Sequence, residues 1–236
     1  MDLSPLAVPH TLAHLTPLLP PAPARILEAG CGRGALAAAL TELGHQVTGV
    51  DRNAEMAAAA RERGVDVIHA DVLDVTGEYD VVLFTRSLHH ADDLDAIVTH
   101  AASLLKPGGR IVVEEFGWER VDQAAAEFAY DNAALLVAAG LLDTETPETD
   151  PLGTWTGNHD RLHRGTTMLA ALASAGELTT VDTPMLWRMV DGRGGRWLDP
   201  GRAPAVLAAL RAAEQRRITA GTLPRAGIVA SALISS

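Results

Sequence analysis

The sequence contains little that could build a cross-linked or metal-rich structure. Cys31 is the single cysteine among 236 residues, so an intramolecular disulfide and a cysteine-rich metal site are both excluded. Its thiol is expected to be buried and inert, because no cationic partner is evident in the sequence. Lys106 is the only lysine, and nothing about function follows from that bias toward arginine.

Long apolar stretches are missing as well. No run reaches the roughly 18 uninterrupted apolar residues of a membrane span, and Met1–Pro5 lacks the basic start of a secretory signal. We therefore expect a cytoplasmic protein without membrane contacts. The formal net charge of −11 would repel a polyanion, which argues against nucleic acid as a partner. A small molecule is the expected substrate, and the sequence does not indicate an oligomeric state.

Short apolar runs alternate with helical stretches from Arg25 onward, as in repeated βαβ units with a mainly parallel sheet. Residues 1–24 are expected to form a helix and linker packed on a single domain, 25–236. A cap is expected at about 118–164, with an acidic loop at 143–156 and a turn at 191–195. The expected strands are 25–29, 46–50, 66–69, 79–84, 111–113, 178–189 and 227–234, and the expected helices are 35–43, 54–63, 93–105, 121–139, 164–175 and 203–219.

The stretch Ile26–Leu36 is typical of a buried strand that enters a helix through a tight glycine loop. Gly30, Gly32 and Gly34 permit positive φ angles and leave room for a ligand, and the helix that follows directs its free N–H groups at whatever lies above the loop. This indicates a seat for a nucleotide-like ligand. The spacing from Gly30 to Ala35 also satisfies the looser dinucleotide pattern.

Five segments taken together favour one family of nucleotide-like ligands over the dinucleotides, and they are Glu28–Gly34, Val50–Arg52, His69–Val72, Tyr79–Phe84 and Leu104–Arg110. In that order and at those intervals, residues 25–115 closely resemble the class I S-adenosylmethionine-dependent methyltransferases. The paired histidines after Phe84 are similar to those of the small-molecule branch related to ubiquinone- and menaquinone-pathway methyltransferases. The resemblance implies a Rossmann-like, doubly wound sheet of seven strands, with helices on both faces.

The resemblance also implies S-adenosylmethionine as the cofactor and assigns its contacts. Asp51 would accept hydrogen bonds from the ribose hydroxyls and Asp71 would receive the adenine amine, while Arg52 and Val72 would flank the ring and Glu28 would shape the glycine loop. Asp51 and Asp71 taken singly are also typical of turns or helix N-caps. The full implied set is Glu28, Gly30, Gly32, Gly34, Asp51, Arg52, Asp71, Val72 and Thr85.

Histidines are the candidate proton acceptors for a hydroxyl substrate. His89 and His90 follow the fourth strand, and His159 and His163 would share one face if the segment between them were helical. The alternative for each is a structural role, and no metal site is predicted. His10 and His14 are expected on a solvated helix face. Four aromatic residues near the cap could line an acceptor pocket or fill a core, namely Trp118, Phe128, Tyr130 and Trp155.

The predicted function is methyl transfer from S-adenosylmethionine to oxygen, nitrogen or carbon of a small metabolite, in specialised metabolism. The family's amino-methyltransferases of nucleic acid commonly carry an Asn/Asp-Pro-Pro-Tyr/Phe motif, which is missing here. Two alternatives remain at the level of sequence: a nicotinamide-dependent oxidoreductase, and an S-adenosylmethionine-binding protein that does not methylate.

Overall fold

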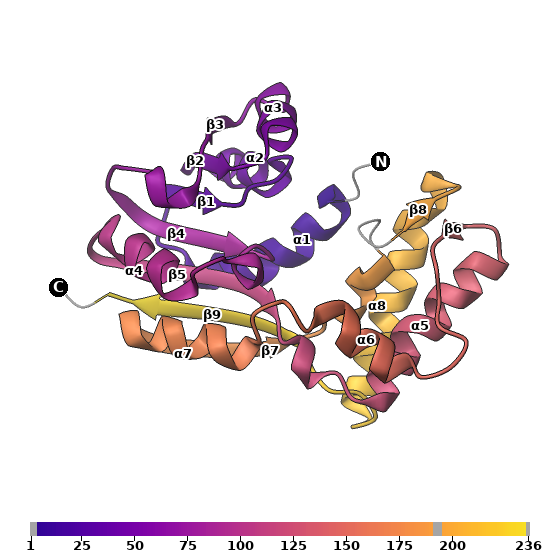
Figure 1. The fold of residues 1–236 in the computed structure, drawn as a ribbon. Helices are drawn as coiled ribbons and strands as arrows, with labels where there is room; N and C mark the ends of the chain where they lie inside the picture. The colour runs from indigo at the N-terminus through magenta and orange to yellow at the C-terminus, as the bar shows by residue number, and fades with distance from the viewer. Residues whose placement is uncertain (1–3, 191–194, 235–236) are drawn as a thin grey trace. The chain divides into compact units, whose positions relative to one another are not determined.

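The computed structural model, which describes residues 4–190 and 195–234, contains a seven-stranded sheet (Figure 1). The strand order is β3-β2-β1-β4-β5-β9-β7, and the pairs β1–β2, β1–β4, β2–β3 and β4–β5 are parallel. The predicted Rossmann-like fold class is confirmed. The strands are β1 Arg25–Ala29, β2 Gln46–Asp51, β3 Asp66–His69, β4 Tyr79–Thr85, β5 Leu105–Phe116, β7 Glu177–Thr183 and β9 Gly227–Leu233.

Eight α-helices are found in the described residues: α1 Ser4–Leu15, α2 Ala35–Glu42, α3 Ala54–Glu62, α4 Leu94–Ser103, α5 Gln123–Ala138, α6 Pro151–His159, α7 Gly165–Ala175 and α8 Ala203–Thr219. Short 3-10 turns connect several elements, and they are η1 Thr16–Leu18, η2 Val72–Asp74, η3 Leu88–His90, η4 Trp118–Arg120, η5 Leu186–Val190 and η6 Pro200–Arg202. A two-stranded antiparallel ribbon joins β6 Leu142–Asp143 to β8 Arg196–Trp197. None of the described helices is long and apolar enough to cross a membrane.

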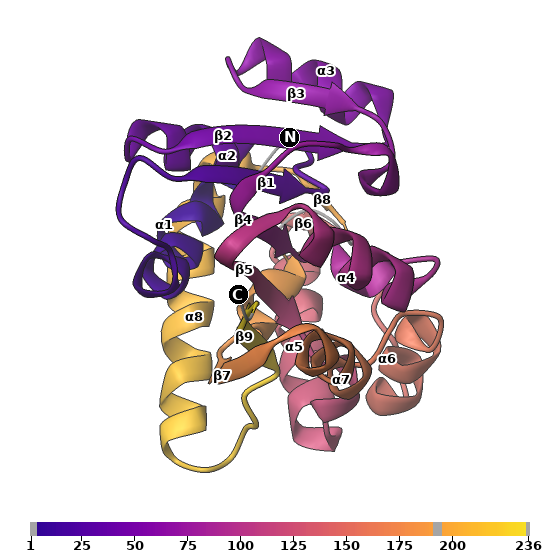
Figure 2. The same ribbon diagram turned by 90° about the vertical axis from the view of Figure 1, so that its left-hand side faces the viewer.

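Strand β4 shows why the sheet is covered on both faces. Its apolar run alternates between two hydrophobic clusters, with Val82 and Phe84 in one and Val81 and Leu83 in the other, because successive side chains of a strand point to opposite faces. Helices α4 and α7 contribute to the first cluster, whereas α2, α3 and the end of α1 contribute to the second (Figure 2). A strand buried on both faces needs a continuous apolar sequence, which is what the sequence provides.

The register of these strands sets where a site can form. Ala29, the last residue of β1, lies opposite Val50 in β2 and Phe84 in β4. The carboxyl ends of three neighbouring strands therefore lie along one edge of the sheet, where open α/β sheets bind their ligands.

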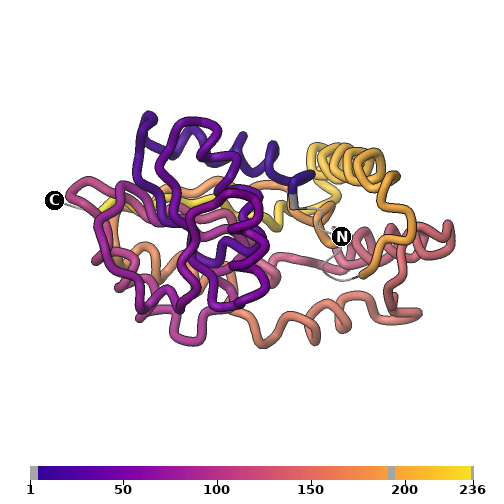
Figure 3. Tube along the Cα trace, turned by 90° about the horizontal axis from the view of Figure 1, so that it is seen from above, coloured from indigo at the N-terminus to yellow at the C-terminus, as the bar shows by residue number. Residues whose placement is uncertain are grey.

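The chain divides into two compact units, and its path through them can be followed in Figure 3. One unit comprises residues 1–7, 116–162 and 182–227, and the other comprises 8–115, 163–181 and 228–236. The expected cap at 118–164 falls almost wholly in the first unit, which also includes residues 182–227. That residues 25–236 act as one domain with an inserted cap stays a prediction.

Three segments illustrate where the structure differs from the sequence-based expectation. Strand β5 begins at Leu105 instead of 111, since its pairing with β4 shifts register after Tyr79 and Gly108 adopts a φ of +76°. The expected loop at 143–156 becomes helical at Pro151, where the Asp150 carboxylate accepts a hydrogen bond from the Gly153 N–H at 2.9 Å. The expected strand at 178–189 stops at Thr183. The turn expected at 191–195 lies mostly outside the described residues.

Strand β7 ends early because the side chain of Glu214 binds the backbone N–H groups of residues that follow it and that lead into η5. This side chain of α8 is fully buried, and its carboxylate accepts hydrogen bonds from three consecutive backbone N–H groups. Oε1 receives those of Met185 and Leu186 at 2.8 and 3.0 Å, and Oε2 receives that of Trp187 at 2.9 Å. Burial raises the pKa of Glu214, and the three donors oppose that rise.

Replacing Glu214 by glutamine is expected to lower the free energy of unfolding by about 1–3 kcal/mol. The amide keeps one acceptor oxygen, but its NH2 group faces the Trp187 N–H, donor against donor. Urea unfolding at pH 7 measures the effect, with Glu177→Gln on exposed β7 as the matched control. Equal stability of the two variants would show that the three N–H bonds do not hold η5.

Candidate functional site

The loop after β1 is built on left-handed glycines. Gly30, Gly32 and Gly34 have φ angles of +72°, +55° and +73°, a region that side chains with a Cβ rarely adopt. A Cβ on Gly34 would meet Ala60 and Val65 at 2.9 Å, whereas a Cβ on Gly32 would have no heavy atom within 4 Å. Gly34 therefore serves packing, and Gly32 has open space around it.

Asp51 holds this loop to β2. Its Oδ2 accepts a hydrogen bond from the Gly32 N–H at 2.8 Å, and its Oδ1 accepts one from the Asn53 N–H at 2.9 Å. The same loop is tied by the Gly30 and Cys31 N–H groups, which both donate to the Val50 carbonyl. Since each carboxylate oxygen can accept a second bond, Asp51 can shape the loop and still receive hydroxyl donors.

Cys31 lies within the glycine loop, and its thiol is buried. The sulfur would be 2.7 Å from a Cβ on Gly49, so the bare backbone of β2 accommodates it. Burial raises the pKa of the Cys31 thiol to about 12, with smaller contributions from Glu28 and Asp51. The expectation that this thiol is buried is confirmed, and its lack of reactivity stays a prediction that the raised pKa supports.

Glu28, near the end of β1, is a buried acid with unused acceptor capacity. Its Oε1 accepts a hydrogen bond from the Thr85 hydroxyl at 3.2 Å, whereas its Oε2 has no hydrogen-bond partner among the described residues. Burial raises the pKa of Glu28 to about 8, although the Thr85 hydrogen bond acts in the opposite direction. An unsatisfied buried acceptor is costly, which makes Glu28 a candidate ligand contact.

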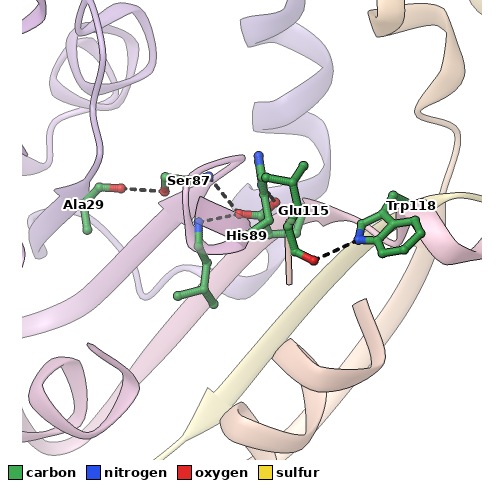
Figure 4. A network of polar contacts seen from close by, with 7 residues as sticks. Ala29, Ser87, His89, Glu115 and Trp118 are labelled. Atoms are coloured by element: carbon green, nitrogen blue, oxygen red, sulfur yellow. Dashed lines mark hydrogen bonds and ion pairs between the residues drawn. The ribbon is translucent and has the colours of Figure 1, made fainter. Parts of the chain in front are cut away.

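The turn after β4 packs directly on the glycine loop. The Ser87 hydroxyl donates to the Ala29 carbonyl at 2.8 Å (Figure 4), and a Cβ on Gly30 would lie 2.6 Å from the Ser87 Cβ. The turn begins with Arg86 at a φ of +53°. Glycine at position 30 thus lets two loops from neighbouring strands meet.

Glu115, at the end of β5, organises the same turn (Figure 4). Its Oε1 accepts the N–H groups of Ser87 and Leu88 at 2.8 and 2.7 Å, and its Oε2 lies 2.7 Å from the His89 Nδ1. Both side chains are at least 95% buried. A carboxylate only accepts hydrogen bonds, so His89 Nδ1 carries the hydrogen in this pair. The sequence did not suggest this role for Glu115; its only signal there was an acidic residue after a buried apolar strand.

The remaining residues assigned to the cofactor lie around these loops. Asp71 caps η2 by accepting the Leu73 N–H at 2.9 Å, and Val72 packs against the hydrophobic cluster that contains Phe84. Arg52 forms an exposed ion pair with Asp92 at 2.9 Å, which contributes little to stability. Their assignment to adenine stays a prediction.

The four candidate histidines fall in different settings. His90 is exposed, with its ring 4.1 Å from that of His89. His159 and His163 do not share a helix face, because α6 ends at His159. His159 stacks on Trp155 and its Nδ1 lies 2.7 Å from the Trp155 carbonyl oxygen, whereas His163 contacts the turn that contains His89. Within residues 4–190 and 195–234, no three metal-ligating side chains cluster.

The aromatic residues of the cap segment fill a core. Trp155 donates its indole N–H to the Trp118 carbonyl at 2.9 Å, and Trp118 donates to the Leu162 carbonyl at 3.2 Å. Trp118, Phe128 and Trp155 are buried together, with Tyr130 packed against them. That they line an acceptor pocket stays a prediction.

The N-terminal helix brings further polar groups to β5. The Thr11 hydroxyl donates to Glu114 Oε2 at 2.9 Å, and His14 Nδ1 lies 3.6 Å from Glu114 Oε1. His14 is thus only partly solvated, because its side chain is 26% exposed and its Nδ1 lies toward Glu114. The sequence gives no sign of the contact between His14 and Glu114, because the two residues lie 100 positions apart in the chain.

Comparisons with known proteins extend these observations. A family model described as a methyltransferase domain matches residues 7–148. A ubiquinone biosynthesis O-methyltransferase of Xanthomonas axonopodis pv. citri (strain 306) is 37% identical over 113 residues, covering 44% of this chain and 47% of that protein. The chain thus spans about half the length of the curated relatives it matches.

Two solved structures share the fold. A protein described as a possible histamine N-methyltransferase from Thermotoga maritima matches with a TM-score of 0.59 at 17% identity, over 99% of this chain and 92% of that one. The magnesium protoporphyrin IX methyltransferase of Synechocystis PCC 6803, solved with bound S-adenosylmethionine, matches with a TM-score of 0.53 at 16% identity, over 99% and 80%.

Glu28 gives the site a pH dependence that can be measured without a ligand. Because its pKa in the folded protein, about 8, exceeds the ordinary 4.5, its contribution to stability is complete below pH 4.5 and is lost as the pH rises toward 8. Glu28→Gln has no proton to lose. Relative to wild type, this variant should gain roughly 3 kcal/mol of stability between pH 5 and pH 8.

Urea unfolding across that pH range measures the difference, and Glu42→Gln on the exposed end of α2 is the control. Parallel stability curves for wild type and Glu28→Gln would contradict a raised pKa at Glu28.

Proposed function

Because the chain belongs to the methyltransferase-domain family, we propose that it transfers the methyl group of S-adenosylmethionine to a hydroxyl oxygen of a small molecule. The observation that carries this proposal is the buried pair of His89 and Glu115, which lies beside a glycine loop suited to the cofactor. The chain is an S-adenosylmethionine-dependent methyltransferase of the class I fold. The proposal concerns the acceptor atom, which is a hydroxyl oxygen.

Three features of the chain fit the cofactor. The open space at Gly32 admits a ligand close to the backbone. The Oε2 of Glu28, which has no hydrogen-bond partner among the described residues, offers an acceptor for a cationic donor such as an ammonium group, and that donor would lower the raised pKa of this carboxyl. Asp51 ends β2 with a carboxylate that is fixed by two backbone N–H groups, which suits a vicinal diol. Bound S-adenosylmethionine supplies a methyl group that is already activated on a sulfonium sulfur.

The protein's remaining tasks are alignment, exclusion of water and removal of the acceptor's proton. Glu115 holds the hydrogen of His89 on Nδ1, so the nitrogen that accepts the hydroxyl proton is Nε2. Carboxylates that orient a histidine in this way also stabilise the imidazolium formed by proton transfer. A hydroxyl acceptor needs such a base, and the relative in Xanthomonas is itself named as an O-methyltransferase.

The cofactor seat is tested by calorimetric titration with S-adenosylhomocysteine. Asp51→Ala should weaken binding by about 1–3 kcal/mol, because a partly buried acceptor of hydrogen bonds is lost. The matched control is Asp66→Ala, which removes an exposed aspartate from the opposite end of the neighbouring strand β3. No binding by wild type would overturn the proposal. Equal affinities of the two variants would remove Asp51 from the site.

The proton acceptor is tested by turnover of a panel of phenols and other hydroxylated small molecules, followed by mass spectrometry of the methylated product. His89→Gln and Glu115→Gln should each lower kcat by about 10²–10⁴-fold. Glu115→Gln keeps an oxygen for the Ser87 and Leu88 N–H groups but places an NH2 group against His89, which reverses the ring tautomer.

His45→Gln, before β2, is the control and should retain wild-type turnover. Full activity of His89→Gln would show that a group other than His89 deprotonates the acceptor. Tight cofactor binding without product from any acceptor would favour a protein that does not methylate.

A further inference from the structure

The turn that carries His89 is held from outside by a second histidine. His163 donates its backbone N–H to the His89 carbonyl at 3.0 Å, and its ring Nε2 lies 2.9 Å from the Ala91 carbonyl oxygen. Because a carbonyl only accepts hydrogen bonds, Nε2 of His163 carries a hydrogen. One residue thus satisfies two carbonyl groups at the end of the turn, 72 positions away in sequence.

The turn has weak internal support. It is a single 3-10 turn, Leu88–His90, with internal bonds from the His90 N–H to Ser87 and from the Ala91 N–H to Leu88 at 3.2 and 3.0 Å. Such turns have poor hydrogen-bond geometry, and carbonyls at a helix end need outside donors. Glu115 supplies acceptors for the first N–H groups, and His163 supplies donors for the last carbonyls.

His163 lies directly before a well-packed helix. Helix α7 begins two residues later at Gly165, and its Met168 and Leu172 are buried in the same hydrophobic cluster as Leu88 of the turn. The exposed fractions of these three side chains are 2%, 0% and 1%. A donor mounted on a well-packed helix can therefore fix the turn's backbone in one position.

We propose that His163 is a positioning residue for methyl transfer, acting through the backbone of residues 88–91 to hold the His89 ring in place. The inference rests on the proposed function, since it takes His89 as the proton acceptor. His163 itself bonds to the turn's carbonyl groups and does not deprotonate the acceptor. Misplacement of a reacting group by about 1 Å can cost 10²-fold in rate, so a clamp on this turn has a measurable effect on turnover.

Three variants separate positioning from a general loss of stability. His163→Leu removes the ring donor at similar volume, and His163→Gln keeps a side-chain N–H donor. His100→Leu is the matched control: Nε2 of His100, on α4, likewise lies 3.0 Å from a backbone carbonyl oxygen, that of Val75, before β4 and away from the turn. Each variant is assayed for kcat, for S-adenosylhomocysteine affinity and for amide hydrogen exchange of residues 87–91.

His163→Leu should speed exchange in the turn at least tenfold and lower kcat about 10- to 100-fold, with S-adenosylhomocysteine affinity within twofold of wild type. His163→Gln should restore both quantities to within about threefold, and His100→Leu should change neither. Wild-type exchange in His163→Leu would disprove the clamp, whatever the turnover. Faster exchange with unchanged kcat, or an equal loss of kcat in His100→Leu, would overturn the positioning role. A wild-type protein that methylates no acceptor overturns the proposed function instead.

Discussion

The geometry of the site depends on one buried carboxylate. Glu115 binds three donors of the turn after β4, two from the backbone and one from His89. Removing a carboxylate from such a place leaves several buried donors without a partner, each at a cost of about 1–3 kcal/mol. This turn also contacts the glycine loop through Ser87 and Gly30. The hydrogen bonds of Glu115 therefore help to position both loops.

Strand β5 carries two glutamates just before its last residue, Phe116, and they serve opposite faces of the sheet. Glu115 faces the turn with His89, and Glu114 binds Thr11 beside His14 of α1. The alternation of side chains along a strand dictates this division. Two adjacent acids thus collect partners from parts of the chain that are far apart in sequence, and both lie at the edge where β1, β4 and β5 end.

The sequence was sufficient for the fold and the family because both depend on local patterns. The apolar runs of β1 and β4 and the glycine loop repeat a known series of motifs, and the family match confirms that resemblance. The sequence could not predict which groups the buried polar side chains bind. Glu115, Glu214 and His163 each bind backbone groups more than 25 residues away, and no periodicity records such contacts. The end of α6 at His159 likewise separated two histidines whose spacing had suggested a common face.

The single cysteine has a practical consequence for spectroscopy. Cys31 is buried beside Gly49 of β2, and burial raises the pKa of its thiol. Maleimide reagents, which react with exposed thiolates, are therefore expected to find little to modify in the native protein. A cysteine introduced at any exposed position can therefore receive a fluorophore or a spin label selectively. The natural residue need not be replaced, and the glycine loop keeps its native sequence during such labelling.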